Sequence, residues 1–315
     1  MVYMSGGNDL ESAVAYNINA MEMAAGSDRV NVVVESKTLK DVVIPTIGGT
    51  TTAKRYQIIH DNDPDHVTSP SHSSVFEDRG NANMDDPAEL ADFVQWADAR
   101  FPARHHMLIM WDHAGSFYGF GGDQAANGRG MSFTDLKTAF RTIQQGVGFR
   151  TWDLVGWDAC MMAALEVDQS LYPYVDYSVA SEELSPGSGW AYDSFLNALE
   201  ANPSMGAVEL GRTIVDVTIP VWVAAGQDNV TLSVVDMSAI PQVTEKVDAL
   251  GSTLSAYLST GMTSSILPGR MRTLVFGQQR ASETGDLADI GNLCANLGSD
   301  PALFASCNAV QRVLG

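Results

Sequence analysis

A histidine and a cysteine stand out because each directly follows an apolar run with the composition of a buried strand. The run Met107–Asp112 leads into His113, and the run Trp152–Trp157 is followed closely by Cys160. A thiolate attacks carbonyl carbon atoms, and an imidazole can protonate the leaving amine. These residue types indicate nucleophilic hydrolysis, with Cys160 as the nucleophile and His113 as its proton partner.

Each residue taken alone has a plainer interpretation. A free cysteine is more often a small buried apolar residue, and a histidine after a strand is often a hydrogen-bonded loop residue. Their joint position favours chemistry, because sites in open parallel sheets form beyond the carboxyl ends of the strands. We expect a helix to begin at or just after Cys160, and its N-terminus would lower the pKa of the thiol. Backbone N–H groups of Gly115 and Cys160 are candidates for an oxyanion hole.

The elements that must position these residues alternate between strand and helix over the first two hundred residues. Several predicted strands are almost continuously apolar, as strands covered on both faces are. This order predicts an α/β fold with a mostly parallel central sheet and helices on both faces. The predicted strands are Val2–Ser5, Val30–Glu35, Arg55–His60, Met107–Asp112, Trp152–Trp157 and Tyr177–Ala180, and the predicted helices among them are Leu10–Ala24, Phe133–Gln145 and Met161–Leu171.

One further helix carries clear start signals. Asp86 is the expected N-cap, Pro87 occupies the first helical position, and Glu89 completes a capping-box pattern. Apolar residues then recur at the spacing of one helix face, at Leu90, Phe93, Val94 and Ala97. Two stretches are predicted to be loops: the polar segment 61–78 and the glycine-rich segment 115–130.

The pattern changes after about residue 205. We expect residues 1–205 to form the catalytic domain and residues 206–315 to form a smaller, mainly helical part that continues the sheet. Helical patterns at Ala207–Ala225 and Ile240–Ser259 surround a strand pattern at Asn229–Asp236. No clean linker separates the two parts, so the predicted boundary is soft.

The charge balance excludes several partners. With 18 Lys and Arg against 38 Asp and Glu, the net charge is −20, which repels nucleic acids and anionic membranes. This negative charge would attract cationic substrates, although the alternative is that the acidic composition serves only to keep the protein soluble. No apolar run of about eighteen residues predicts a membrane span, and no signal-peptide pattern opens the chain.

Besides Cys160, the chain has two cysteines, Cys294 and Cys307. They could close a small disulfide loop, a pattern typical of an exported protein with one reactive thiol. Free buried thiols in a cytosolic protein are the alternative. We expect a secreted or periplasmic protein, with a cytoplasmic location still open.

The sequence resembles the clostripain family of cysteine peptidases, relatives of the caspases, gingipains and legumain. The resemblance spans roughly residues 1–260. The segment around Cys160 and the Ser-x-Glu…Pro-Gly-x-Gly-Trp segment are the most specific. The matching segments are Tyr3–Glu11, Leu108–His113, Asp153–Met162, Ser181–Trp190 and, more weakly, Thr231–Asp236.

The resemblance implies a caspase-like three-layer sandwich, a dyad of His113 and Cys160, and cleavage of peptides or proteins after Arg, with Lys second. It places Asp158 at the base of the pocket for the basic side chain, which a carboxylate would bind in bidentate fashion. A carboxylate that merely caps the helix near Cys160 is the alternative. Ser181, Glu182 and Glu183 would flank the same pocket, or form a solvated loop.

One departure concerns the residue after the histidine, which is Ala114 where the family usually has glycine. If its N–H serves the oxyanion hole, the added methyl group would crowd the scissile carbonyl. The alternative function is therefore a weak or inactive homologue that binds basic peptides. A different cysteine hydrolase or acyltransferase on the same fold is a third possibility.

The resemblance also implies self-cleavage and calcium. Arg129, in the glycine-rich loop, is the candidate cleavage site, so we expect a monomer or a self-cleaved two-chain form. No cofactor is needed for the chemistry, and calcium is expected only as an activator or structural ion. Asp61, Asp63 and Asp65 begin like a calcium loop, but His66 and His72 occupy positions where that loop needs glycine and glutamate. A solvated acidic loop is the better interpretation.

Overall fold

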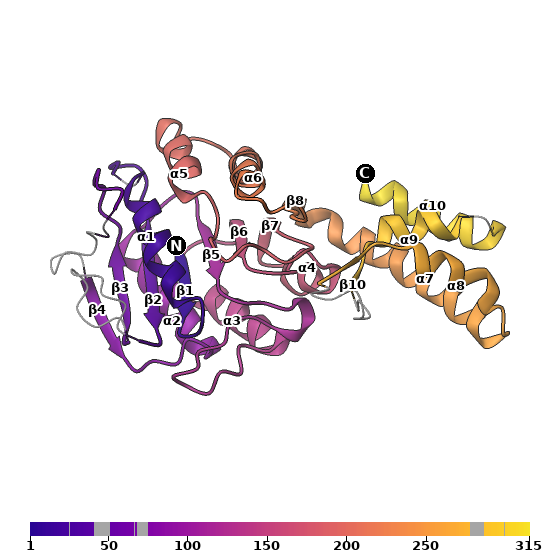
Figure 1. The fold of residues 1–315 in the computed structure, drawn as a ribbon. Helices are drawn as coiled ribbons and strands as arrows, with labels where there is room; N and C mark the ends of the chain where they lie inside the picture. Colours follow the sequence, from indigo (N-terminus) through magenta and orange to yellow (C-terminus); the bar gives the residue numbers. More distant parts are fainter. Residues whose placement is uncertain (25, 41–50, 66, 68–74, 278–286, 299) are drawn as a thin grey trace. The chain divides into compact units, whose positions relative to one another are not determined.

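The chain forms two compact units, Met1–Val235 and Asp236–Gly315. Figure 1 presents the computed structural model. The predicted boundary at residue 205 lies inside the first unit, because helix α6 (Ala207–Ala224) packs against the sheet of that unit. The structure describes residues 1–24, 26–40, 51–65, 67, 75–277, 287–298 and 300–315.

In the described part of the chain, a sheet of eight strands runs through the first unit in the order β4-β3-β2-β1-β5-β6-β7-β8. Strands β2, β1, β5, β6 and β7 run parallel to one another, whereas β3 pairs antiparallel with both β2 and β4 at one edge. The sheet is therefore mostly parallel, as predicted. The strands are β1 Val2–Gly6, β2 Val33–Thr38, β3 Ala53–Gln57, β4 Val75–Gly80, β5 Met107–Trp111, β6 Trp152–Asp158, β7 Val175–Ala180 and β8 Ser233–Asp236.

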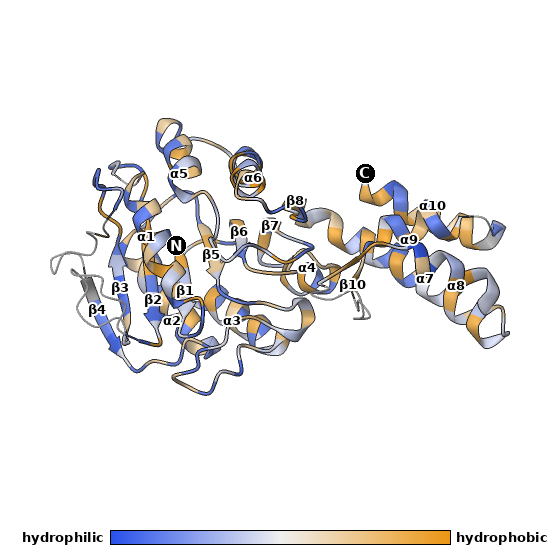
Figure 2. Ribbon diagram, in the orientation of Figure 1, coloured by the Kyte–Doolittle hydropathy of each residue, from blue (hydrophilic) through white to orange (hydrophobic). Residues whose placement is uncertain are grey.

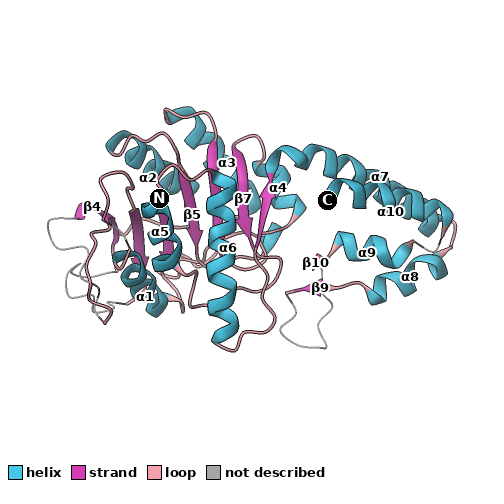
Figure 3. Ribbon diagram, turned by 90° about the horizontal axis from the view of Figure 1, so that it is seen from above, coloured by secondary structure: helices cyan, strands magenta, loops and turns pink. Residues whose placement is uncertain are grey.

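Helices cover both faces of this sheet (Figure 3). On one face lie α1 (Glu11–Glu22), α5 (Tyr192–Ala201) and α6. On the other lie α2 (Pro87–Arg100), α3 (Phe133–Gly146) and α4 (Leu165–Leu171). This is the predicted three-layer sandwich.

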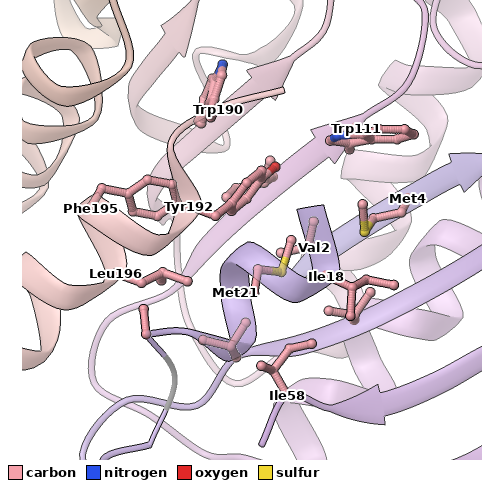
Figure 4. Packing of buried hydrophobic residues seen from close by; sticks show 14 of the residues in the cluster. Val2, Met4, Ile18, Met21, Ile58, Trp111, Trp190, Tyr192, Phe195 and Leu196 are labelled. Atoms are coloured by element: carbon pink, nitrogen blue, oxygen red, sulfur yellow. The ribbon is translucent and has the colours of Figure 1, made fainter. Parts of the chain in front are cut away.

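The core between α1, α5 and the sheet is mainly apolar, although Asn17 and Glu22 of α1 are also buried. Val2 of β1, Ile18 of α1 and Phe195 of α5 belong to one buried apolar cluster, in which Phe195 lies beside Tyr192 (Figure 4). Burying one such side chain contributes about 1.5–3 kcal/mol, so this cluster helps to hold the central strand in place. The helices show the matching alternation of hydrophilic and hydrophobic residues along their length (Figure 2).

Helix α2 begins as predicted. The carboxylate of Asp86 accepts a hydrogen bond from the backbone N–H of Ala88, and the predicted stripe of Leu90, Phe93, Val94 and Ala97 is buried. The capping box does not form. Glu89 pairs with Arg79 and Arg55 instead, and the N–H of Asp86 donates to the carbonyl of Asn83.

Strand β4 was not predicted, because its residues fall largely in the segment expected to be a loop. Half of its sequence Val-Phe-Glu-Asp-Arg-Gly is charged, so no extended apolar pattern marks it. Backbone pairing with β3 and the ion pair between Arg79 and Glu89 hold it at the sheet edge. Residues 66 and 68–74 of the same segment lie outside the described residues.

The second unit is mainly helical, as predicted. Its elements are α7 (Ile240–Ser259), α8 (Thr263–Arg272), β9 (Val275–Phe276), β10 (Leu287–Ala288), α9 (Ile290–Leu297) and α10 (Pro301–Leu314), with β9 and β10 antiparallel. Cys294 and Cys307 are buried in its core with Leu250 and Val310. Both cysteines are free thiols in this structure, so it shows no disulfide between these two described residues.

Within the described residues, none of the helices combines the length and the apolar character needed to span a bilayer.

Candidate active site

The candidate catalytic residues leave two neighbouring parallel strands at the same level. Trp111 at the end of β5 lies opposite Asp158 at the end of β6. His113 and Cys160 each follow two residues later. Because paired strands lie about 4.8 Å apart, the two backbones reach the same edge of the sheet side by side. This edge is also where the strand order reverses, between β1 and β5, and sites form at such points.

The imidazole of His113 has a partner that the sequence did not predict. Its Nε2 lies 2.7 Å from Oδ1 of Asp9, which follows β1. The side chains of His113 and Asp9 are 47% and 79% exposed. The hydrogen bond to His113 lowers the pKa of Asp9 below its usual value. The signal that could have identified Asp9 was its position just beyond a third strand, inside the matching segment Tyr3–Glu11.

Cys160 is half-buried, and its Sγ accepts a hydrogen bond from the N–H of Ser185 at 3.3 Å. No hydrogen bond joins His113 to Cys160 in this structure, although both residues are described. The loop that contains Ser185 therefore holds the thiol, and Asp9 holds the imidazole.

The prediction that a helix begins at or just after Cys160 is wrong. Helix α4 begins at Leu165, and Met161 adopts a left-handed conformation with φ of 59°. The N–H of Met161 donates to the carbonyl of Glu183, so the chain after the cysteine runs along the next loop rather than winding into a helix.

The expected lowering of the thiol pKa does not occur either. Burial raises the pKa of Cys160, and the nearby carboxylates of Asp158 and Glu183 raise it further. The N–H of Ser185 acts in the opposite direction without offsetting them. The conformation seen here therefore favours the thiol form of Cys160 over the thiolate.

Asp158 is 6% exposed and fixed from one side. Its Oδ2 accepts hydrogen bonds from the N–H of Trp190 at 3.1 Å and from the hydroxyl of Tyr192 at 2.9 Å. Burial raises the pKa of Asp158 to about 7. Since no helix starts near Cys160, the alternative role as a helix cap is excluded.

Ser181, Glu182 and Glu183 form a tightly bonded turn beside Cys160. The Ser181 hydroxyl donates to the carbonyl of Glu183, and the N–H groups of Glu182 and Glu183 donate to Oγ1 of Thr231. Ser181 and Glu183 are buried, whereas Glu182 is half-buried. The turn is therefore not a solvated loop, and it places the Glu183 carboxylate near the thiol.

The predicted oxyanion donors differ in their availability. The N–H of Gly115 donates to the carbonyl of Gly119 at 3.0 Å and is engaged. The N–H groups of Ala114 and Cys160, both in the described part of the chain, make no hydrogen bond. Arg129 is exposed on the loop between β5 and α3, as its predicted role requires.

The described residues contain no group of three or more His, Cys, Asp or Glu side chains arranged to hold a metal ion, and the calcium expectation stays a prediction. The carboxylates of Asp61 and Asp63 accept the backbone N–H groups of Asp63 and Asp65 and so form local turns. His66 and His72 lie outside the described residues.

Comparison with known proteins gives one family and several similar structures. Residues 2–297 match the model of the clostripain family. A secreted C11 cysteine protease from Bacteroides thetaiotaomicron, in complex with an irreversible peptide inhibitor, has 19% identity and a TM-score of 0.69, with 99% of this chain and 81% of that chain covered. An inactive zymogen C11 protease from Parabacteroides distasonis has 15% identity and a TM-score of 0.70, with 99% and 80% covered. A comparison with curated proteins gives no match.

Proposed function

Because this chain belongs to the clostripain family of cysteine peptidases, we propose that it is an endopeptidase that cleaves after arginine, and less readily after lysine, with Cys160 and His113 as its catalytic pair. The observation that carries the proposal is the register of β5 and β6, which brings His113 and Cys160 to the same edge of the sheet. No other cysteine of the chain suits the role, because Cys294 and Cys307 are each 1% exposed.

In the proposed reaction, the Cys160 sulfur attacks the scissile carbonyl and His113 delivers a proton to the leaving amine. Asp9 binds Nε2 of His113, which leaves Nδ1 to face the thiol. The N–H groups of Ala114 and Cys160 stabilise the oxyanion, and water then hydrolyses the acyl-enzyme. Attack requires the thiol to leave the N–H of Ser185 and approach the imidazole.

The arginine preference is proposed to come from Asp158. The Trp190 N–H and the Tyr192 hydroxyl orient its carboxylate, and burial removes it from competing water. A guanidinium can then form a charge-assisted pair with it. The net charge of −20 favours approach of the same cationic substrates.

We also propose that the chain cuts itself after Arg129. The exposed arginine in a glycine-rich loop supports this, and so does the resting state of the thiol, which is held away from His113. One similar structure is described as an inactive zymogen. A related protein is described as secreted, and we propose the same location here.

The second candidate function is a weak or inactive homologue that binds basic peptides. The raised pKa of Cys160 and the methyl group of Ala114 favour it. The two functions share the proposed binding of a basic side chain by Asp158 and differ in turnover.

The deciding experiment compares turnover of peptide amides that end in arginine, lysine or citrulline, under reducing conditions. We expect the wild type to hydrolyse them in the order arginine, lysine, citrulline, and Cys160→Ala and His113→Ala to lose at least about a thousandfold in kcat. Cys294→Ala is the matched control and should retain activity. The second function would be established instead if the wild type bound the arginyl peptide but hydrolysed it no faster than Cys160→Ala does.

A further inference from the structure

Three buried carboxylates lie next to the segment that carries His113. Asp85 and Asp112 are 7% and 3% exposed, and Asp123 is fully buried. Lys37 pairs with Asp123 at 2.7 Å and also donates to the carbonyl of Ala82. Within this described cluster, Lys37 is the one cation, and its ammonium group contacts the carboxylate of Asp123. A buried carboxylate without a cation is costly, so the cluster can accept another positive charge.

Asp112 is the member with a vacant acceptor. Its Oδ1 accepts the side-chain N–H of Asn8 at 2.7 Å and the backbone N–H of His113 at 2.6 Å. The Ser5 hydroxyl lies near the carboxylate, but Oδ2 is buried with no hydrogen-bond partner of good geometry. Burial raises the pKa of Asp112 well above its usual value.

The glycine-rich loop brings a backbone nitrogen to the same place. The N–H of Gly130 donates to Oδ2 of Asp85 at 3.1 Å. A carbon added to Cα of Gly121 would lie 2.7 Å from Oδ1 of Asp85, 3.7 Å from Oδ2 of Asp112 and 3.7 Å from Cα of Gly130. Both carboxylates and the Cα atom of Gly130 thus lie close to the same point beside Gly121.

Only glycine fits at position 130. Its φ is 67°, and a Cβ there would lie 2.8 Å from the carbonyl oxygen of Phe120. The preceding residue, Arg129, is exposed. The peptide bond between Arg129 and Gly130 therefore joins an exposed arginine, which a protease can reach, to a nitrogen that already donates to the buried carboxylate of Asp85.

We propose that Asp85 and Asp112 form a binding site for a primary ammonium group, whose ligand is the N-terminus created at Gly130 by cleavage after Arg129. The proposal rests on the proposed function only for the source of that cut. Water adds across the peptide bond: the C–N bond breaks, a C–O bond forms at Arg129, and both water hydrogens end on the Gly130 nitrogen. The products are a carboxylate on Arg129 and an ammonium on Gly130.

The new ammonium keeps its contact with Asp85 and gains N–H donors for Oδ2 of Asp112. Asp112 holds the backbone of His113, and Asn8, next to Asp9, donates to the same carboxylate. Pairing at this site would therefore fix both members of the Asp9–His113 pair. Cleavage would therefore give the buried carboxylate of Asp112 a cationic partner, and Asp112 would then hold the backbone of the catalytic histidine more firmly.

The test makes the cut without using the enzyme's own activity. In a Cys160→Ala chain, residues 124–129 are replaced by the recognition sequence of a site-specific protease that cuts before glycine. The cut chain is then treated with formaldehyde and cyanoborohydride, and methylation is followed by mass spectrometry. We expect the Gly130 amine to react at least about tenfold more slowly than Lys40, whose side chain is 78% exposed, and cutting to raise Tm.

Asp112→Asn and Asp85→Asn should each restore fast methylation of Gly130, whereas Asp193→Asn on the exposed start of α5 should not. A Gly130 amine as reactive as Lys40, with a Tm that cutting does not raise, would overturn the proposal. If the Gly130 amine is protected in the engineered chain but the wild type never cuts itself, the ammonium site is supported and the proposed self-cleavage is wrong.

Discussion

Asp9 and His113 form an exposed pair, and exposed ion pairs add only about 0–1 kcal/mol to stability. The contact is therefore better explained by positioning than by folding. With Nε2 bound to a carboxylate, the imidazole has a fixed orientation and a fixed nitrogen available for Cys160.

We predict that Asp9→Asn lowers kcat about tenfold to a hundredfold, with little change in KM, because a misplaced imidazole costs rate rather than binding. The rate of Cys160 alkylation by iodoacetamide should fall as well, whereas Tm should stay constant. Asp153→Asn is the matched control, since Asp153 pairs with His105 at 2.9 Å outside the site. Equal losses in the two variants would assign Asp9 no special role.

The pKa of about 7 for Asp158 gives a second prediction at this scale. Below pH 7 the free carboxyl is protonated and cannot pair with a guanidinium, and above pH 7 it can. The preference for arginyl over citrullyl substrates should therefore fall as the pH drops from about 8 to 6. The ratio of the two kcat/KM values at each pH measures this, because effects of pH on the steps common to both substrates cancel in it.

Asp158→Asn should reduce the arginyl-to-citrullyl ratio about tenfold to a hundredfold and remove its dependence on pH, because a hydrogen bond to a charged group contributes about 1.5–3 kcal/mol. A ratio unchanged by the substitution would place arginine recognition elsewhere.

At the scale of helices and strands, sequence signals predicted the structure correctly where all the interacting residues are adjacent in the chain. Asp86 caps α2 through its own carboxylate, so three consecutive residues of sequence describe the whole interaction. The chain after Cys160 behaved differently, because the N–H of Met161 finds its acceptor at Glu183. Contacts with a distant loop override the local preference for a helix.

Asp86→Ala should destabilise the protein by about 1 kcal/mol, the usual contribution of an N-cap. Urea denaturation measures the difference, and it should appear in the midpoint rather than in the slope. Asp216→Ala, at an exposed position of α6, is the control and should change stability by less than about 0.5 kcal/mol. A loss in the control as large as in Asp86→Ala would argue against the cap.

For the whole molecule, the net charge of −20 should act on association. Raising the salt concentration from about 0.02 to 0.5 M shortens the range of electrostatic attraction several-fold. We expect kcat/KM for a cationic arginyl substrate to fall several-fold, and that for a neutral citrullyl substrate to stay nearly constant. Parallel losses for both substrates would indicate a salt effect on the enzyme rather than on encounter.

The sequence by itself determined the parallel sheet, the helices on its faces and the two strand ends that carry His113 and Cys160, because apolar periodicity and chain order are local properties. Only the tertiary structure decided what surrounds those two residues. Asp9 joins His113 and Ser185 binds Cys160 through contacts that span long stretches of chain. Burial, which raises the pKa of Asp158 and Cys160, likewise depends on the packed fold and has no signature in neighbouring residues.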